Sequence, residues 1–309
     1  MGPTAAGKTD LALALAKKYP VELISVDSAL VYQGMDIGTA KPEADILKEF
    51  PHHLIDIMQP TESYSAGGFR DDALILMADI TNRGKVPLLV GGTMLYFKAL
   101  QQGLADLPSA DPTIRLQLEA ELAQFGLAHL HQRLALVDPV SAARIHINDP
   151  QRIQRALEVH MITGRSLTDL TREQTVDFPY RVAKIILSPF ERSVLHQRIA
   201  LRYKNMIKEG FIDEVKGLFD SGLYHPDLPA IRAVGYRQAW SYLSGEYDLD
   251  TFIEKAIIAT RQMAKRQLTW LRSQDDGVWF DSGEGLPMKQ IMQFLTDSCP
   301  ELSDNMALK

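Results

Sequence analysis

Short apolar runs alternate along the chain with longer segments of amphipathic pattern. The apolar runs predict strands at 21–26, 53–58, 86–92, 181–189 and 277–281. Residues 10–19 and 67–84 have the spacing of helices with one apolar face. Strands and helices that alternate in this way favour an α/β fold, with a parallel sheet covered by helices on both faces.

Residues 104–180 differ from the rest, because they show only helical periodicity. Asp111–Pro112 and Asp149–Pro150 are the residue types that begin helices, and Gly164 is typical of a helix end. We therefore expect an α/β core made of residues 1–103 and 181–309. An all-helical insertion domain, residues 104–180, would interrupt it.

The chain opens with a phosphate-binding loop of the form G-x-x-x-x-G-K-T, made of Gly2, Pro3, Thr4, Ala5, Ala6, Gly7, Lys8 and Thr9. In such a loop backbone N–H groups converge on phosphate oxygens, and the next helix adds its positive end. Lys8 supplies a point charge, and the Thr9 hydroxyl is placed to ligate Mg²⁺. A chance Gly-Lys-Thr turn is the alternative, but an amphipathic helix follows at once. The motif predicts a P-loop-type parallel sheet flanked by helices, and a di- or triphosphate ligand.

A phosphate loop normally follows a buried strand, yet only Met1 precedes Gly2 in this sequence. Without that strand the neighbouring strands would expose unpaired edges. We expect the gene to encode a short apolar strand upstream, with Met1 as an internal residue.

Polar residues follow two of the predicted strands, at the points where these strands end. Asp27 and Ser28 follow the first, and Gly91, Gly92 and Thr93 lie at the end of the third. Ligands of open parallel sheets bind beyond the carboxyl ends of the strands, so these residues are expected to face the phosphate loop. Asp27 could support a metal ion, act as a general base or cap a turn. For Thr93, spacing alone favours a plain helix N-cap.

Composition limits the cellular location of the protein and the kinds of site that it can contain. The chain has 309 residues, of which 46% are hydrophobic, enough for a large core. No apolar run approaches the roughly 20 residues that span a bilayer, and the N-terminus has no signal-peptide pattern. The single cysteine, Cys299, excludes an internal disulfide and a Cys-rich zinc site. These features favour a cytoplasmic protein.

The net charge of −6 means that any nucleic-acid surface must be a local basic patch. Basic residues recur in pairs on predicted helix faces or around a glycine: Arg152 and Arg155, Arg198 and Arg202, Arg232 and Arg237, Arg261 and Lys265. A charged helix face is usually only solvated, but arginine together with glutamine suits contacts with phosphates and base edges. The histidines show no metal-ligand spacing.

Six segments, in order and across nearly the whole chain, resemble the bacterial tRNA dimethylallyltransferases, or tRNA isopentenyltransferase family: GPTAAGKT, SVDSALVYQGMDIGTAKP, LLVGGTMLYFKAL, INDPQRIQRALEV, AIRAVGYRQAW and ATRQMAKRQLTWLR. The resemblance implies transfer of a dimethylallyl group from dimethylallyl diphosphate, with release of diphosphate. The acceptor would be the exocyclic amine of the adenosine on the 3′ side of the anticodon, in tRNAs that read codons starting with U.

The resemblance also implies roles for individual residues. Asp27 would accept a proton from the adenine amine, Thr93 would line the channel where adenine meets donor, and Arg202 would lie near the diphosphate. Mg²⁺ would be the cofactor, at Thr9. The implied tRNA contacts are Asp27, Ser28, Ala29, Leu30, Thr93, Arg115, Gln151, Arg152, Ile153, Gln154, Arg155, Arg232, Ala233, Val234, Gly235, Tyr236 and Arg237. The insertion would clasp the anticodon stem-loop, and the enzyme would act as a monomer away from membranes.

Three alternatives remain open from the residues alone. A P-loop small-molecule phosphotransferase would need a nucleotide-base pocket and gives no reason for the basic insertion. A prenyltransferase of free AMP would not need that insertion either. A non-catalytic RNA-binding module would keep its function after Asp27→Asn.

Overall fold

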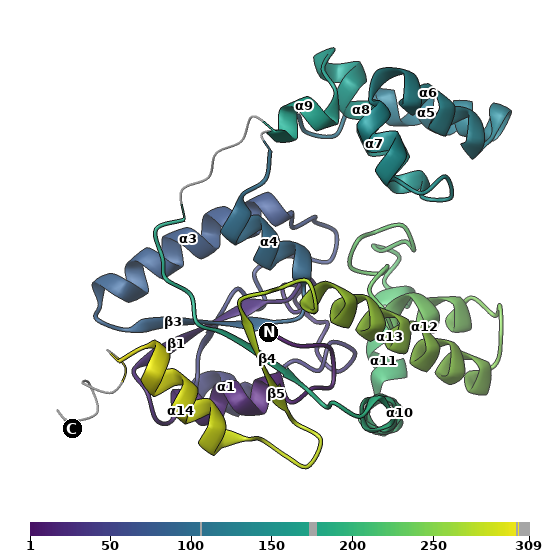
Figure 1. Ribbon diagram of the computed structural model, residues 1–309. Coiled ribbons are helices and arrows are strands. Elements are labelled where there is room, and N and C mark those ends of the chain that lie inside the picture. Colours follow the sequence, from purple (N-terminus) through teal and green to yellow (C-terminus); the bar gives the residue numbers. More distant parts are fainter. Residues whose placement is uncertain (106, 173–177, 301, 303–309) are drawn as a thin grey trace. The chain divides into compact units, whose positions relative to one another are not determined.

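The structure is a computed structural model, and it describes residues 1–105, 107–172, 178–300 and 302. The chain forms two compact units (Figure 1). The α/β unit comprises Met1–Leu100 and Pro179–Lys309, and the helical unit comprises Gln101–Phe178. The sequence places the helical insertion at 104–180.

Parallel strands form the centre of the α/β unit, as the sequence predicts. Three strands pair in the order β2–β1–β3, and two more form the pair β4–β5. Their bounds are β1 Val21–Val26, β2 His52–His53, β3 Val86–Gly91, β4 Lys184–Ser188 and β5 Gly277–Asp281. The backbone of Met1 runs along β4, because its carbonyl accepts from Leu187 N at 2.9 Å and its amine donates to Ile185 O at 2.7 Å.

Helices cover both faces of the strands (Figure 1). On one side lie α3 (Ala66–Asn82) and α4 (Met94–Gln102), and on the other α1 (Lys8–Ala16) and α14 (Met288–Ser298). Buried Phe69, Ala73 and Met77 recur every four residues on α3, which is the apolar face that the sequence pattern predicts.

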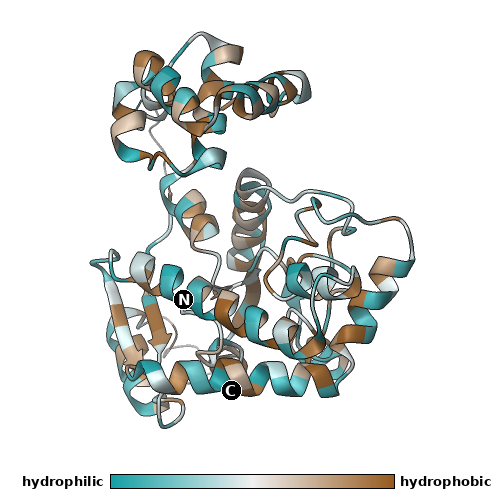
Figure 2. Ribbon diagram, turned by 90° about the vertical axis from the view of Figure 1, so that its right-hand side faces the viewer, coloured by the Kyte–Doolittle hydropathy of each residue, from teal (hydrophilic) through white to brown (hydrophobic). Residues whose placement is uncertain are grey.

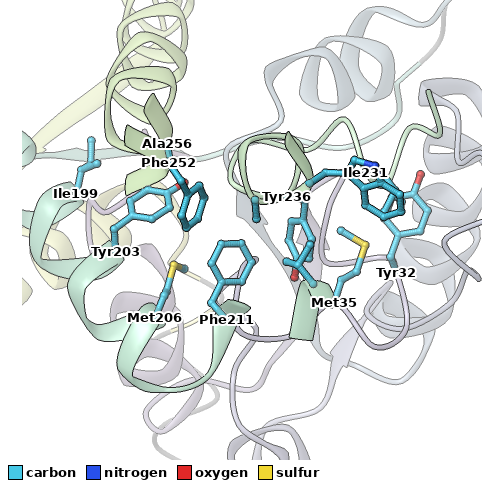
Figure 3. Close-up of a cluster of buried hydrophobic side chains, with 14 of the residues drawn as sticks. Tyr32, Met35, Ile199, Tyr203, Met206, Phe211, Ile231, Tyr236, Phe252 and Ala256 are labelled. Carbon is cyan, nitrogen blue, oxygen red and sulfur yellow. The ribbon is translucent and has the colours of Figure 1, made fainter. Parts of the chain in front are cut away.

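The remaining helices of the α/β unit pack around a second, aromatic core. Apart from α2 (Ala44–Glu49), which buries no residue, they are α10 (Arg192–Lys208), α11 (Phe211–Asp220), α12 (Tyr236–Leu243) and α13 (Leu249–Leu271). Figure 3 shows Tyr203, Phe211, Tyr236 and Phe252 side by side in this core, and the Phe211 and Tyr236 rings meet edge to face at 5.2 Å. Glu214 ties this core to the loop after β1, since its carboxylate accepts from Ile37 N at 2.7 Å and from the Tyr236 hydroxyl.

The helical unit consists of α5 (Pro112–Phe125), α6 (Leu127–Val137), α7 (Pro139–Arg144), α8 (Pro150–Thr163) and α9 (Leu167–Arg172). Asp111 caps α5 by accepting from Thr113 N, and Asp149 caps α8 by accepting from Arg152 N. Both predicted helix starts are thus confirmed, and α8 ends at Gly164 as expected. In Figure 2, hydrophobic and hydrophilic residues alternate along the helices. No helix in the described part of the chain is long and apolar enough to cross a membrane.

The predicted strand at 53–58 is wrong beyond its first residue, since β2 covers only His52–His53. Leu54 and Asp56 adopt φ angles of 64° and 56°, which extended strands exclude. The Asp56 carboxylate forms an ion pair with the buried ammonium of Lys41 in this turned conformation. Within 54–58, Met58 makes an isolated bridge to Tyr32. The strand predicted at 181–189 is shorter, at Lys184–Ser188.

Candidate active site

A cavity of about 770 Å³ opens at the carboxyl ends of β1 and β3. This is where ligands bind in open parallel sheets. The site residues predicted from sequence that line it are Thr4, Ala5, Ala6, Gly7, Lys8, Thr9, Asp27, Ser28, Ala29, Leu30, Thr93, Arg202, Arg232, Ala233, Val234 and Tyr236. Gly2, Pro3, Gly235 and Arg237 belong to the same segments without lining the cavity. Segments far apart in sequence therefore meet at one site.

The phosphate loop runs directly into α1. Gly7 adopts φ 88° and ψ 23°, a left-handed conformation that suits glycine, and α1 begins at the next residue, Lys8. The first N–H groups of a helix have no partner within the helix, so the start of α1 presents donors to an anion.

Three side chains from distant segments hold the phosphate loop in place. Gln267 of α13 accepts from Thr4 N at 2.9 Å, and Arg202 of α10 donates to the Thr4 hydroxyl at 3.1 Å. Ser282, which follows β5, donates to Ala6 O at 2.9 Å. The loop is therefore fixed by tertiary contacts as well as by its own turn.

Arg198 and Arg202 lie one turn apart on α10 and both line the cavity, as their spacing predicts. Their contacts differ. Arg198 donates to Ser282 O at 2.6 Å and so supports the segment that holds the loop, whereas Arg202 also donates to Thr39 O at 3.3 Å.

The cavity has a surplus of positive charge. Burial lowers the pKa of Lys8 to about 8, Asp27 partly opposes this shift, and Arg202 adds to it. Burial also lowers the pKa of Arg202, against the opposing effects of Tyr203 and Asp27. Lys8, Arg198, Arg202 and Arg232 line the cavity together with two carboxylates, Asp10 and Asp27, and this excess of positive charge suits a ligand that carries several negative charges.

Asp27 and Thr93 are held together at the ends of β1 and β3. The Asp27 carboxylate accepts from Ala29 N at 2.9 Å through Oδ1. Among the described residues, none donates a hydrogen bond to its Oδ2. Thr93 immediately precedes α4, but its hydroxyl accepts from Ser28 N at 3.0 Å, so it also joins the two strand ends.

Oxygen atoms suited to a hard cation gather beside the phosphate loop. Ser25 in β1 and Asp27, the first residue after β1, both line the cavity together with Thr9. Ser25 is only 3% exposed, and its hydroxyl has no hydrogen-bond partner in the described part of the chain. The described residues hold no group of three or more His, Cys, Asp or Glu side chains that could bind a metal. These donors fit Mg²⁺ that takes its other ligands from phosphate and water.

In the helical unit, two of the predicted arginines are engaged in a buried ion pair. Arg115 and Arg155 contact the carboxylate of Glu158 at 2.9 and 2.7 Å, and Glu158 is 1% exposed. Burial opposes ionisation of Glu158, but hydrogen bonds from Arg115 and Arg155 outweigh it and hold its pKa below the usual value. These arginines therefore stabilise the unit whatever else they bind.

The other residues of α8 that were predicted to contact tRNA differ in how accessible their side chains are. The Arg152 side chain is 74% exposed, and Gln151 is exposed beside it. Gln154 is half-buried and donates to Arg115 O at 3.5 Å. Ile153 lies fully buried in the core of the unit, so its side chain cannot reach a ligand.

The residues of segment 232–237 likewise differ in exposure. Arg232 and Arg237 are exposed, and Arg232 lines the cavity. Gly235 is buried with φ 99° before α12, and the hydroxyl of Tyr236 is taken by Glu214. Arg232 and Arg237 can therefore meet a partner at the surface, whereas half-buried Ala233 and Val234 contribute to the cavity lining.

Residues 30–274 match the family model of IPP transferase. The chain is also 41% identical to a full-length tRNA isopentenylpyrophosphate transferase from Bacillus halodurans, whose crystal structure superposes with a TM-score of 0.70. That match covers 99% of this chain and 96% of the other. The chain belongs to the IPP transferase family.

Two further structures resemble this IPP transferase. The tRNA delta(2)-isopentenylpyrophosphate transferase from Staphylococcus epidermidis is 35% identical, with a TM-score of 0.67, and the match covers 96% of each chain. A eukaryotic dimethylallyltransferase acting on tRNA is 26% identical, with a TM-score of 0.77 over 97% of this chain and 75% of that one. The family expected from the sequence segments is confirmed.

Sequence reasoning missed several residues that build the site. Gln267 and Ser282 hold the phosphate loop, Ser25 faces the cavity, and Glu158 organises the helical unit. Two of them had a local signal, because Ser25 lies two residues before Asp27 and Glu158 lies three residues after Arg155 on one helix.

The shifted pKa of Lys8 makes stability depend on pH. Between pH 8 and about 10.4 the unfolded chain keeps a proton on Lys8 that the folded protein has lost, so the free energy of unfolding should rise with pH by on the order of 3 kcal/mol. Lys8→Met should remove this rise, as seen by urea unfolding across that range. Lys48→Met, at an exposed lysine, is the matched control. The same pH slope in wild type and Lys8→Met would show that Lys8 is not the cause.

Proposed function

We propose that this IPP transferase transfers a dimethylallyl group from dimethylallyl diphosphate to tRNA, on the adenosine 3′ to the anticodon in tRNAs reading codons that start with U. One observation carries the proposal: the phosphate loop, and Asp27 with Thr93, line a single cavity. A diphosphate donor and an acceptor amine can therefore meet there. The Bacillus halodurans relative is a tRNA isopentenylpyrophosphate transferase, and the eukaryotic one acts on tRNA.

The donor is bound mainly through its diphosphate. The N–H groups at the start of α1 and the charges of Lys8 and Arg202 hold the phosphate oxygens. Thr9 would hold Mg²⁺, and Ser25 would support it through a water molecule. Mg²⁺, when bound, neutralises charge on the diphosphate. The cavity volume leaves room for the five-carbon group beside the diphosphate.

The acceptor amine needs a base, since its lone pair is delocalised into the adenine ring. As the bond from nitrogen to the allylic carbon forms and the bond from carbon to diphosphate oxygen breaks, Asp27 takes the proton that the amine loses. Lys8 and Arg202 stabilise the charge that develops on the departing diphosphate. Thr93 keeps the Asp27–Ser28 turn in place through Ser28 N.

tRNA binding is assigned to two sets of exposed residues. On α8 these are Gln151 and Arg152, and beside the cavity they are Arg232 and Arg237. Proteins read RNA at unstacked, single-stranded bases, so the adenine must leave the anticodon-loop stack to reach Asp27. We assign the clasping of the anticodon stem-loop to the helical unit. Because the acceptor is tRNA, we place the enzyme in the cytoplasm, acting as a monomer.

The direct experiment is incubation with labelled dimethylallyl diphosphate and bulk tRNA, followed by nucleoside analysis. Label in a single modified adenosine next to the anticodon is the expected result. Modification of free AMP in preference to tRNA, or phosphate transfer from ATP to a small molecule, would replace the proposal with one of its rivals. RNA binding without transfer of label would indicate that the protein is a non-catalytic RNA-binding module.

Asp27 is expected to act as the base. Asp27→Asn keeps the acceptor for Ala29 N and so preserves the turn, but it removes the proton acceptor. Turnover should fall by roughly a hundredfold or more, while tRNA affinity changes little. Asp45→Asn, at an exposed aspartate, is the control. Wild-type turnover in Asp27→Asn would remove this residue from the mechanism.

Ser25→Ala should separate a ligand role from a structural one. The folded protein loses a buried hydroxyl without a protein partner, so its melting temperature should stay unchanged or rise. The Mg²⁺ affinity measured with inorganic diphosphate should fall roughly tenfold. Ser188→Ala is the matched control, because that buried hydroxyl donates to Pro189 O and its loss should destabilise the protein. An unchanged Mg²⁺ affinity in Ser25→Ala would contradict the assignment.

Arg152 and Arg155 should behave differently although they share α8. Arg152→Ala should weaken tRNA binding and lower the slope of log affinity against log salt by about 1, without a change in melting temperature. Arg155→Ala should also destabilise the helical unit, because buried Glu158 loses a partner. Arg144→Ala removes one exposed charge from the same unit as a control. Donor affinity should not move in any of them, and its loss in Arg152→Ala would contradict the assignment.

A further inference from the structure

Gln267 of α13 joins two loops at the floor of the cavity. Its Oε1 accepts from Thr4 N at 2.9 Å, and its Nε2 donates to Gly92 O at 2.8 Å. A backbone N–H can only donate and a carbonyl can only accept, so these partners determine the orientation of the amide. A carboxylate, an ammonium or an apolar side chain could not make both bonds.

Each of the two loops leads to one half of the reaction. Thr4 belongs to the phosphate loop, and its hydroxyl accepts from Arg202. Gly92 precedes Thr93, which holds Ser28 N beside Asp27. The hydrogen bonds of Gln267 therefore connect the donor-binding loop to the loop that carries the base.

The surroundings of Gln267 leave little room for adjustment. A Cβ atom added to Gly92 would lie 2.7 Å from Gln267 Nε2, 3.2 Å from Gly2 O and 3.5 Å from Lys8 Nζ. On α13, Ala264 and Leu271 are buried three residues before and four residues after Gln267, so the helix is anchored on this face. A side chain held this tightly can define a distance between the two loops.

We propose that Gln267 is a positioning residue, which sets the separation between the donor diphosphate and Asp27. By occupying Thr4 N, it also leaves only the later N–H groups of the loop to bind phosphate. Gln267 acts through these loops and does not touch the reacting atoms. The inference rests on the proposed function, since it concerns the geometry of that transfer. A misplacement of about 1 Å between reacting groups can lower a rate a hundredfold.

Gln267→Met, a side chain of similar length without hydrogen bonds, is the first test. Single-turnover transfer to tRNA should slow by roughly 10- to 100-fold, while the Kd of dimethylallyl diphosphate, measured without tRNA, should change less than about threefold. Gln262→Met, at an exposed position of the same helix, should leave both values unchanged. A Gln267→Met rate within twofold of wild type, or a loss confined to the donor Kd, would overturn the inference. An inactive wild type would instead refute the proposed function.

Gln267→Glu is the second test, and it holds even if Gln267→Met folds poorly. The introduced carboxylate can accept from Thr4 N but not donate to Gly92 O, whereas its protonated form can do both. The rate of Gln267→Glu divided by that of wild type should therefore rise as the pH falls. The charged and titratable groups that line the cavity are present in both enzymes, so the titration that they share is divided out: Lys8, Asp10, Asp27, His52, Arg198, Arg202 and Arg232. A ratio independent of pH would mean that Gln267 only fills space, and would overturn the inference.

Discussion

Cations outnumber carboxylates in the cavity, four to two, and the excess of positive charge around two half-buried cations, Lys8 and Arg202, is the constraint on which the site depends. Burial lowers the pKa of both cations, so the protein without a ligand holds them at a cost in free energy. An anionic ligand with several charges relieves that cost, because it supplies the missing countercharge in a poorly hydrated place. The charge of the cavity is therefore compatible with the diphosphate donor that we propose.

The fold supplies what such a ligand needs from three directions. Parallel strands end at one edge of the sheet and place Asp27 and Thr93 there. The start of α1 adds N–H donors. Helices that come late in the chain, α10 and α13, add Arg202 and Gln267. The late helices hold the phosphate loop directly, so its position depends on residues far from it in sequence.

Information that lies in neighbouring residues was sufficient for much of this description. The eight residues of the phosphate loop, the caps at Asp111 and Asp149, and the apolar run of β1 each carry their own signal, and the structure has the predicted loop-to-helix junction, both caps and the strand. The grouping of Asp27 with Thr93 followed from the general rule for parallel sheets.

The remaining features depend on partners that are distant in sequence. Leu54 has a positive φ angle instead of an extended conformation, and Asp56, two residues later, forms an ion pair with Lys41. Glu158 has one near partner, Arg155, three residues before it on α8, but its other partner, Arg115, is 43 residues away. Gln267 is one glutamine in a basic helix until Thr4 and Gly92 are seen beside it, 263 and 175 residues away.

The most direct test is a structure of the protein with an anticodon stem-loop and an unreactive thio analogue of dimethylallyl diphosphate. The account predicts that the diphosphate lies on Lys8, Thr9 and Arg202, with the flipped adenine amine within hydrogen-bond distance of Asp27. Thr4 N should remain bonded to Gln267. A diphosphate bound outside the phosphate loop, or an adenine amine remote from Asp27, would contradict the claim that one cavity joins donor and acceptor.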